Sequence, residues 1–459
     1  MISMPRLLIF SALCVPLTLA SAPDKTLADF QDLVPTATWE EFWPDASSEP
    51  EVRSVTAELW TQAMQAVLEV QDILRIPARE QPYYLDGPIV LKSGQTLIAD
   101  AGTEIRLKPG TNTCMVRNKN LVGFPEGPVP ADTQPDHDII VEGGIWTTLA
   151  TTAKESNGNL RGASAKANAV SGTHGVILMQ NVRGVTVRNV TVRQSRAFAV
   201  HLANVEDFTV DGLTLENHRR DGVHVNGPAR RGLFRRVSGD SHDDTVALNA
   251  WEWKNYAPSY GAIHDVVIED ISGSPEGIRS ANSIRFLPGK KRFADGALLD
   301  CPIHDITVRR TGDITEFKLY DQPNLELGRD KDFSEGPGRL KNFRFEDLAF
   351  TRPGRIEIHA DLDGLVLQNA TLAERAPLIL IGPKSQTYRH GDDPSRWVEI
   401  FSPDLDCTAR NIIVSGVRVQ GESTGMTPEE VIRVIVQTPN PDYPATTPRG
   451  GMGKGVWVR

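Results

Sequence analysis

Two short segments of the sequence, 221–226 and 244–249, align without a gap at an offset of 23 residues. Each begins with an aspartate and continues as a β-rich run, GVHVN in the first and TVALN in the second. This offset is the length of one coil of a parallel β-solenoid, whose coils stack at the spacing of hydrogen-bonded strands, about 4.8 Å. The alignment therefore predicts that Asp221, Asp243 and Asp244 crowd onto one patch of one face.

The same period extends over much of the chain. The triplets at 185–187 and 208–210 recur out of phase with those at 200–202 and 223–225, so each coil contributes to at least two sheets. Alternation within strands sends Val200 and Leu202, and their equivalents in the next coils, inward; it sends outward His201, His224, Asn226 and Asn249. We therefore expect an all-β fold, a single-stranded parallel β-helix that spans residues 81–420 as one domain.

The remaining segments are expected to flank the solenoid. Residues 1–22 have the charged start, short apolar stretch and small-x-small end of a signal peptide cleaved after Ala22, which predicts a secreted or periplasmic protein. Residues 23–80 contain a predicted amphipathic helix, Glu51 to Leu74, that would cover the open end of the solenoid. Residues 147–171 are interpreted as a long loop, and 421–459 as a C-terminal cap or tail.

Composition limits the partners. The formal net charge is −10 and basic runs are absent, which argues against nucleic acid as a partner. Beyond the N-terminus there is no run of eighteen apolar residues, so no membrane span is expected. We expect a monomer.

Several motifs resemble the pectinase-type right-handed β-helix proteins. The run Tyr84 to Ser93, YLDGPIVLKS, which follows the predicted helix and a strand with its proline, looks like the N-terminal cap and first coils of that group. The run Ile139 to Trp146, IIVEGGIW, is similar to the Gly-rich strand that precedes the catalytic coils. The closest similarity is to the polygalacturonase family of glycoside hydrolases, over most of residues 50–310.

The resemblance implies a catalytic site. In that family an Asn-Thr-Asp-Gly coil is followed by Gly-Asp-Asp, and the three aspartates are catalytic; this chain has Arg-Arg-Asp221-Gly and His-Asp243-Asp244 at matching places. By that similarity Asp243 is the general acid, Asp221 and Asp244 activate water, and the configuration at the sugar is inverted. Inversion needs one protonated and one ionised carboxyl group, typically about 6.5 to 9.5 Å apart, and mutual repulsion can keep one of three acids protonated. Aspartates at strand-entry turns also occur for structural reasons, because they bond local backbone amides.

A second set of residues is predicted to bind a carbohydrate substrate. Arg285 aligns with His224 and His201 in one outward column, and aromatic faces after the second motif could stack on sugar rings. The predicted substrate-binding residues are His224, Arg285, Asn226, Asn249, His201, Trp251 and Trp253. The family's Gly-His-Gly step is absent, and its Arg-Ile-Lys step has only a loose counterpart in Ile284 to Lys290, which makes a galacturonan substrate doubtful.

Three functions remain open at this point. The first is an inverting hydrolase of a pectin-like or other acidic glycan with no cofactor and no metal. The second is a polysaccharide lyase or epimerase, in which Arg285 or a histidine abstracts a proton beside a uronate carboxyl group, with calcium as a possible aid. The third is a non-catalytic solenoid that binds surfaces or glycans and would tolerate replacement of all three aspartates.

Overall fold

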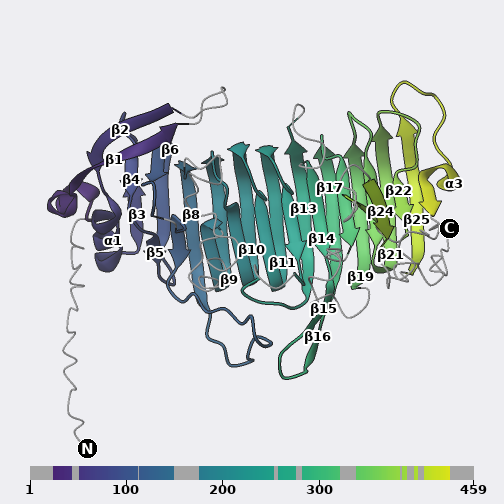
Figure 1. Ribbon diagram of the computed structural model, residues 1–459, viewed down its shortest axis with the longest axis horizontal. Coiled ribbons are helices and arrows are strands. Elements are labelled where there is room, and N and C mark those ends of the chain that lie inside the picture. The colour runs from purple at the N-terminus through teal and green to yellow at the C-terminus, as the bar shows by residue number, and fades with distance from the viewer. Residues whose placement is uncertain are drawn as a thin grey trace, which may run out of the picture.

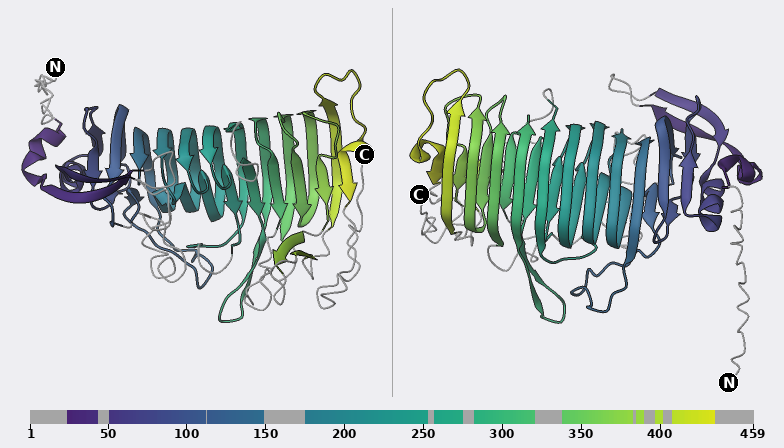
Figure 2. Two further views of the ribbon diagram at one scale, coloured as in Figure 1. Left: turned by 45° about the horizontal axis from the view of Figure 1, so that its top comes forward. Right: turned by 180° about the vertical axis from the view of Figure 1, so that it is seen from behind.

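The chain forms one long stack of coils (Figures 1 and 2). The computed structural model describes residues 24–43, 51–111, 113–148, 175–252, 257–274, 282–320, 338–382, 385–389, 397–401 and 408–434. The predicted signal peptide, nearly all of the predicted loop 147–171, Trp253 and residues 435–459 lie outside these ranges. The colour in Figure 1 runs steadily along the stack from the N-terminal to the C-terminal end, so sequence order is spatial order.

The solenoid is built from parallel strands. In the described chain twenty strands pair in parallel, each with strands one coil away, which makes the fold a single-stranded right-handed parallel β-helix, as predicted. These strands are β3 (Ile73–Ile76), β4 (Tyr83–Leu85), β5 (Ile89–Leu91), β6 (Thr96–Leu107), β7 (Val116–Asn118), β8 (Asp136–Thr147), β9 (Gly175–Arg193), β10 (Phe198–His218), β11 (Val223–Ser241), β12 (Val246–Asn249), β13 (Ile263–Gly273), β14 (Ser283–Leu287), β17 (Ile303–Gly312), β18 (Glu316–Tyr320), β19 (Arg339–Ala349), β20 (Arg355–His359), β21 (Asp361–Leu372), β22 (Ile379–Ile381), β25 (Ala409–Val419) and β26 (Ile432–Val434).

The interior is filled by columns of apolar side chains. One column is formed by residues that pair from coil to coil and are fully buried: Val200, Val223, Val246, Ile284, Phe317, Ile356 and Ile379. Each such side chain contributes roughly 1.5–3 kcal/mol by leaving water. The inward positions predicted from alternation are therefore correct.

The neighbouring column points outward and consists mostly of basic side chains. His201 pairs with His224, His224 with Ala247, Ala247 with Arg285, and Arg285 with Lys318. The first four members were predicted to align, and the register confirms this. Because strands in neighbouring coils are hydrogen-bonded, residues in this column lie one strand spacing apart.

The long strands turn corners at residues with left-handed backbone. In β9 the corners include Asn181 and Asn189, and in β10 they include Asn204 and Gly212, all at positive φ. Asparagine and glycine tolerate this conformation best, because its steric penalty is small for glycine and is offset by local hydrogen bonds for asparagine. The corners let one strand cover successive faces of a coil.

The N-terminal cap differs in part from the prediction. A short 3₁₀ helix, η1 (Leu27–Leu33), precedes an antiparallel ribbon of β1 (Thr36–Trp43) and β2 (Glu51–Glu58), and the helix α1 is confined to Thr61–Val70. The predicted helix Glu51 to Leu74 is therefore wrong at both ends: residues 51–58 form β2, and Ile73 and Leu74 begin β3. Residues 51–58 are rich in β-branched side chains, which lose rotamer freedom in a helix, and β1 offers them a partner strand. α1 buries Ala63, Met64, Val67 and Leu68 against the first coils, the capping role predicted for it.

Smaller elements branch from the solenoid or close its other end. Two antiparallel hairpins, β15 (Gly289–Arg292) with β16 (Leu298–Cys301) and β23 (Ser385–Arg389) with β24 (Trp397–Phe401), arise between coils. At the C-terminal end the short helix α3 (Pro428–Val431) leads into β26, which pairs with β22. No helix of the described residues is both long enough and apolar enough to cross a membrane.

Two glycines at the same backbone angle test how tightly the coils stack. Gly143 in β8 has φ of 75°, and a Cβ there would lie 2.1 Å from the carbonyl oxygen of Ala99 in the coil below; Gly110 has φ of 80° and nothing within 4 Å. We expect Gly110→Ala to cost only the left-handed strain, about 1–2 kcal/mol. Gly143→Ala should cost about 1–3 kcal/mol more, because backbone must move. Urea denaturation of both variants measures the difference, and equal losses would contradict the close stacking.

Candidate active site

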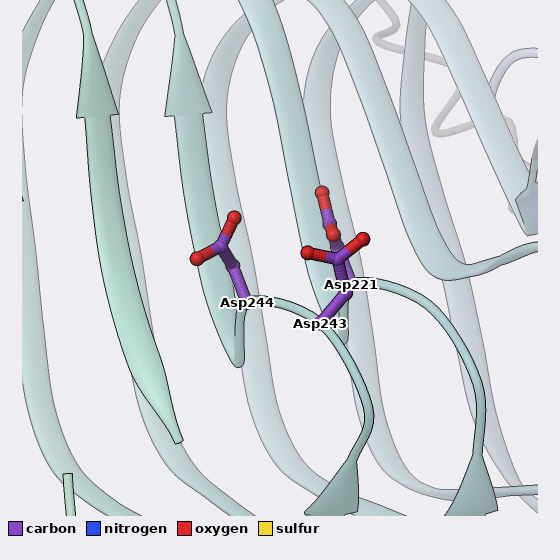
Figure 3. A group of neighbouring side chains, drawn as sticks. All are labelled: Asp221, Asp243 and Asp244. Carbon is purple, nitrogen blue, oxygen red and sulfur yellow. The ribbon is translucent and has the colours of Figure 1, made fainter. Parts of the chain in front are cut away.

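The register of β11 and β12 brings the three aspartates together. Val223 pairs with Val246, and the amide of Gly222 donates to the carbonyl oxygen of Asp244 at 2.9 Å, so Asp221 and Asp244 lie at the same end of adjacent strands. Asp243 occupies the turn just before Asp244. One carboxylate oxygen from each of the three residues lies within 4.8 Å of those from the other two, and Figure 3 shows the three side chains grouped on two adjacent coils. The predicted proximity of Asp221, Asp243 and Asp244 is therefore present.

Asp244 is held by three partners from the next two coils. Its side chain is fully buried, and its Oδ1 accepts hydrogen bonds from the Ser283 hydroxyl at 2.6 Å and from the Lys318 ammonium at 2.8 Å. The Arg285 guanidinium lies 3.1 Å from Oδ2, which has no hydrogen-bond partner of good geometry in the described chain. Two cations at this distance stabilise the ionised carboxylate.

Asp221 is also buried and ionised. Its Oδ2 lies 2.6 Å from His224 Nδ1 and 3.4 Å from Arg285 Nη2, and its Oδ1 has no hydrogen-bond partner in the described residues. Burial alone would raise the pKa of Asp221, but the hydrogen bond from His224 and the charge of Arg285 outweigh it and hold the pKa well below its usual range. Asp221 is therefore ionised well below the usual pKa of an aspartate, and its Oδ1 is a buried acceptor without a hydrogen-bond partner in the described residues.

Asp243 is the exception among the three. Its side chain is 33% exposed and its Oδ2 accepts one hydrogen bond, from Arg220 at 3.0 Å. Burial of the carboxyl end and the negative charges of Asp221 and Asp244 raise the pKa of Asp243 to about 6, against the opposing charge of Arg220. The environment therefore pushes the pKa values of Asp243 and Asp221 apart, so that Asp243 can carry a proton at a pH where Asp221 is ionised.

His224 does not face the substrate as predicted. It is fully buried, its ring stacks on Phe198 at 3.9 Å, and its two nitrogens lie 2.6 Å from Asp221 and 3.2 Å from Glu252. With both nitrogens occupied the ring has no polar atom left for a sugar hydroxyl. Its contact is with the site's own carboxylates.

Three further side chains that were predicted to contact substrate, those of Asn226, His201 and Asn249, are buried. Asn226 is buried and uses its amide in a donor bond to Glu252 and an acceptor bond from His201, which is itself buried. Asn249 is buried, and its carbonyl oxygen accepts a bond from Arg285 Nε at 3.2 Å. The alternation that sends these side chains outward was predicted correctly, but the outward face is covered here, which sequence alternation alone does not reveal.

The aromatic residues after β12 do not offer a stacking face in the described chain. Trp251 is only 2% exposed and packs directly on Gly289, where an added Cβ would come within 2.6 Å of its ring. The ring of Trp251 therefore has no exposed face, and its contact with sugar stays a prediction. Of the predicted substrate-binding residues that are described, Arg285 keeps some exposure, 12% of its side chain.

Sequence reasoning missed Glu252, Ser283 and Lys318. Lys318 belongs to β18 and shares the outward column with Arg285, whereas Lys290, the expected counterpart of the family's lysine, lies on the β15 hairpin. The hairpin lengthens the connection between β14 and β18, so the repeat is not evident in the sequence there. An alignment of Ile284 with Phe317 would have placed Lys318 beside Arg285. Glu252 follows β12 without any motif, so only the fold reveals it.

Acidic and basic side chains lie next to one another in the site. The acidic groups are Asp221, Asp243, Asp244 and Glu252, and the basic groups are Arg220, His224, Arg285 and Lys318. Carboxylate oxygens are the ligands that calcium prefers, and three of these groups converge. A divalent cation there would compete with Arg285 and Lys318 for the same oxygens, so the donor set fits such an ion poorly.

The chain matches no known protein-family profile, and no curated protein matches it in sequence. Solved structures with a similar course of the chain include the endo-xylogalacturonan hydrolase from Aspergillus tubingensis, at 12% identity and a TM-score of 0.47, which covers 87% of this chain and 95% of that chain. The family 28 exopolygalacturonase of Yersinia enterocolitica has 12% identity and a TM-score of 0.42, with 87% and 83% covered.

A third similar structure has a different description. The surface protein and adhesin PfbA of Streptococcus pneumoniae has 11% identity and a TM-score of 0.42, over 87% of this chain and 96% of that chain. The structural neighbours are thus polygalacturonases and other pectinase-like parallel β-helix proteins, which is the resemblance expected from the motifs. Because they include both hydrolases and an adhesin, the chemistry of this chain must be argued from its own residues.

Proposed function

We propose that this protein is a glycoside hydrolase that cleaves a polysaccharide or oligosaccharide, a pectin-like or other acidic glycan, with inversion at the sugar. The observation that supports the proposal is a difference in pKa between adjoining carboxyl groups. Asp243 is partly exposed and protonated up to about pH 6, whereas Asp221 is buried and ionised. A hydrolase needs both an acid and a base beside one glycosidic bond. We further propose export through the N-terminal segment and a monomeric state.

In the proposed reaction the proton of Asp243 moves to the glycosidic oxygen as the bond from that oxygen to the anomeric carbon breaks. A water oxygen bonds to the same carbon from the opposite face. One water proton passes to the carboxylate pair of Asp221 and Asp244, whose Oδ1 and Oδ2 respectively have no hydrogen-bond partner in the described chain. His224, Arg285 and Lys318 hold the other oxygens of this pair in place.

The spacing of the carboxylates bears on stereochemistry. One oxygen from each carboxyl group lies within 4.8 Å of those from the other two. The roughly 6.5–9.5 Å typical of inverting enzymes and the roughly 5 Å of retaining ones are separations between whole carboxyl groups, which exceed the separation of their nearest oxygens. We propose inversion, because hydrogen bonds from His224 and Lys318 hold Asp221 Oδ2 and Asp244 Oδ1 in place and so keep both carboxylates from moving onto a sugar carbon. Water is the smaller nucleophile.

The lyase or epimerase alternative is less well supported. It needs a base, and the guanidinium of Arg285 lies against Asp221 and Asp244; burial opposes the charge, but these carboxylates raise the pKa of Arg285 well above its usual range. His224, with a carboxylate at each nitrogen, has no lone pair to receive a proton. Neither candidate base is therefore free to act.

The experiment that tests the function is product analysis on a panel of pectic, algal and host glycans. A hydrolase yields new reducing ends without ultraviolet absorbance, whereas a lyase yields an unsaturated sugar that absorbs. Proton NMR taken early in the reaction reports the anomeric configuration. Retention of the anomeric configuration would contradict the role of Asp221 and Asp244 in activating water. A product that absorbs in the ultraviolet would show that the reaction is an elimination and not a hydrolysis.

The pH profile follows from the proposed protonation states. The acid must hold its proton, so kcat/KM should fall about tenfold per pH unit above the pKa of Asp243, about 6. On the acidic side activity should persist below the usual pKa of an aspartate, because Asp221 remains ionised there. Rates measured from pH 3 to 9 check this, and a profile with its maximum above pH 7 would contradict the assignment of Asp243 as the acid.

A further inference from the structure

Both nitrogens of His224 face carboxylate oxygens. Asp221 Oδ2 lies 2.6 Å from Nδ1 and Glu252 Oε2 lies 3.2 Å from Nε2, and the ring is fully buried. A neutral imidazole has a single N–H, so one of its nitrogens would direct a lone pair at a carboxylate. Only the imidazolium form satisfies both contacts, since it donates at both nitrogens.

Glu252 is itself fixed in place. Its side chain is 5% exposed, and Oε2 also accepts a hydrogen bond from the Asn226 amide at 3.0 Å. Asn226 is in turn held by His201 at 2.8 Å. Burial opposes ionisation, but the charge of His224 and its hydrogen bond lower the pKa of Glu252 to about 2. A buried glutamate with this anchoring is a fixed negative charge behind the histidine.

The other groups around His224, apart from Asp221, do not provide a negative charge that would favour protonation of its ring. Phe198 stacks on one face of the ring, His201 meets it edge-on at 5.2 Å, and Arg285 approaches the same oxygen of Asp221. Arg220, which lies over Phe198 at 5.1 Å, is a cation. Among the described groups that face the ring, the two carboxylates are the ones that favour its protonation, and Asp221 is occupied by the site itself.

We propose that Glu252 is a positioning residue that keeps His224 as an imidazolium, so that His224 holds Asp221 Oδ2 and fixes the orientation of the Asp221 carboxylate. This role rests on the proposed hydrolase function. Glu252 touches no reacting atom, and it acts only through His224. Burial alone would lower the pKa of His224, but the charge of Glu252 and the bond to Asp221 raise it to about 9.

The test compares Glu252→Gln with Glu269→Gln by ¹⁵N NMR of the imidazoles and by kinetics. Glu269 is also mostly buried, 8% exposed, but it pairs with Arg309 and Arg310 away from the site. In the wild type and in Glu269→Gln we expect both nitrogens of His224 to remain protonated from pH 5 to 8. In Glu252→Gln the ring should lose a proton within that range, and kcat at pH 7 should fall about tenfold with KM nearly unchanged.

Several outcomes would overturn the proposal. A wild-type His224 that titrates near the usual value of about 6.5 excludes a permanent imidazolium. A Glu252→Gln variant whose histidine still holds both protons, or whose kcat is unchanged when it loses one, excludes the positioning role. If Glu252→Gln does not fold, Glu252→Asp should restore the protonated ring and most of kcat. The NMR titration needs no activity, so a protein without glycosidase activity would refute the proposed function and still test the charge state of His224.

Discussion

Replacement of Asp243 by asparagine should lower kcat on a polysaccharide roughly 100- to 10,000-fold while KM changes little, because the leaving oxygen then receives no proton. The amide keeps the size of the side chain and can still bond Arg220, so the fold should persist. The loss of activity above about pH 6 should vanish in this variant, since the group that titrates there is gone. Steady-state rates across pH, on the glycan identified by the panel, measure both effects.

A substrate with an acidic leaving group separates the roles of the three aspartates. Such a group departs without protonation, so an aryl glycoside should recover most of the activity of Asp243→Asn but little of that of Asp221→Asn. Asp240→Asn is the matched control: Asp240 lies three residues away, is 34% exposed and pairs with His242 outside the cluster. If Asp243→Asn and Asp240→Asn are equally active on the polysaccharide, Asp243 is not the acid.

Replacement of Arg285 by leucine should destabilise the protein by about 3–5 kcal/mol. The change leaves Asp221 and Asp244 buried beside each other without the guanidinium that lies 3.4 Å and 3.1 Å from their oxygens. Removing one partner of a buried ion pair leaves the other charge uncompensated in a low-dielectric environment. Urea denaturation followed by circular dichroism measures the loss.

The control for this variant is another arginine on the solenoid. Arg309 pairs with Glu269 at 2.6 Å, but 39% of its side chain is exposed. Solvent screens such a pair, so Arg309→Leu should cost at most about 1 kcal/mol. If Arg285→Leu and Arg309→Leu lower the free energy of unfolding by similar amounts, Arg285 does not compensate the charges of the aspartate cluster.

Much of the fold could be predicted from the sequence, because a solenoid repeats one local pattern. Val200, Val223 and Val246 occupy equivalent places in successive coils, so the period that aligns them in sequence also pairs them in space. The N-terminal region has no such period. There a helix was predicted over Glu51 to Leu74, and the pairing of β2 with β1 decided its first part instead.

The site could be predicted only where it follows the repeat. Asp221 and Asp244 are separated by one coil, so their proximity followed from the offset, and Arg285 followed from its column. Lys318 obeys the same column, but the β15–β16 hairpin changes the spacing in sequence. His224 was predicted to contact substrate because nothing in a single sequence shows that Glu252 covers it.

The sequence by itself determined the coil, its inward and outward faces and the convergence of three aspartates, because each depends on a regular spacing along the chain. Only the tertiary structure decided which of these acids keeps a proton. His224 and Arg285 outweigh burial and keep Asp221 ionised, whereas burial and two neighbouring carboxylates raise the pKa of Asp243. A pKa depends on all charges and solvent within several ångströms, and the repeat along the chain shows neither how deeply a side chain is buried nor which residues outside the repeat cover it.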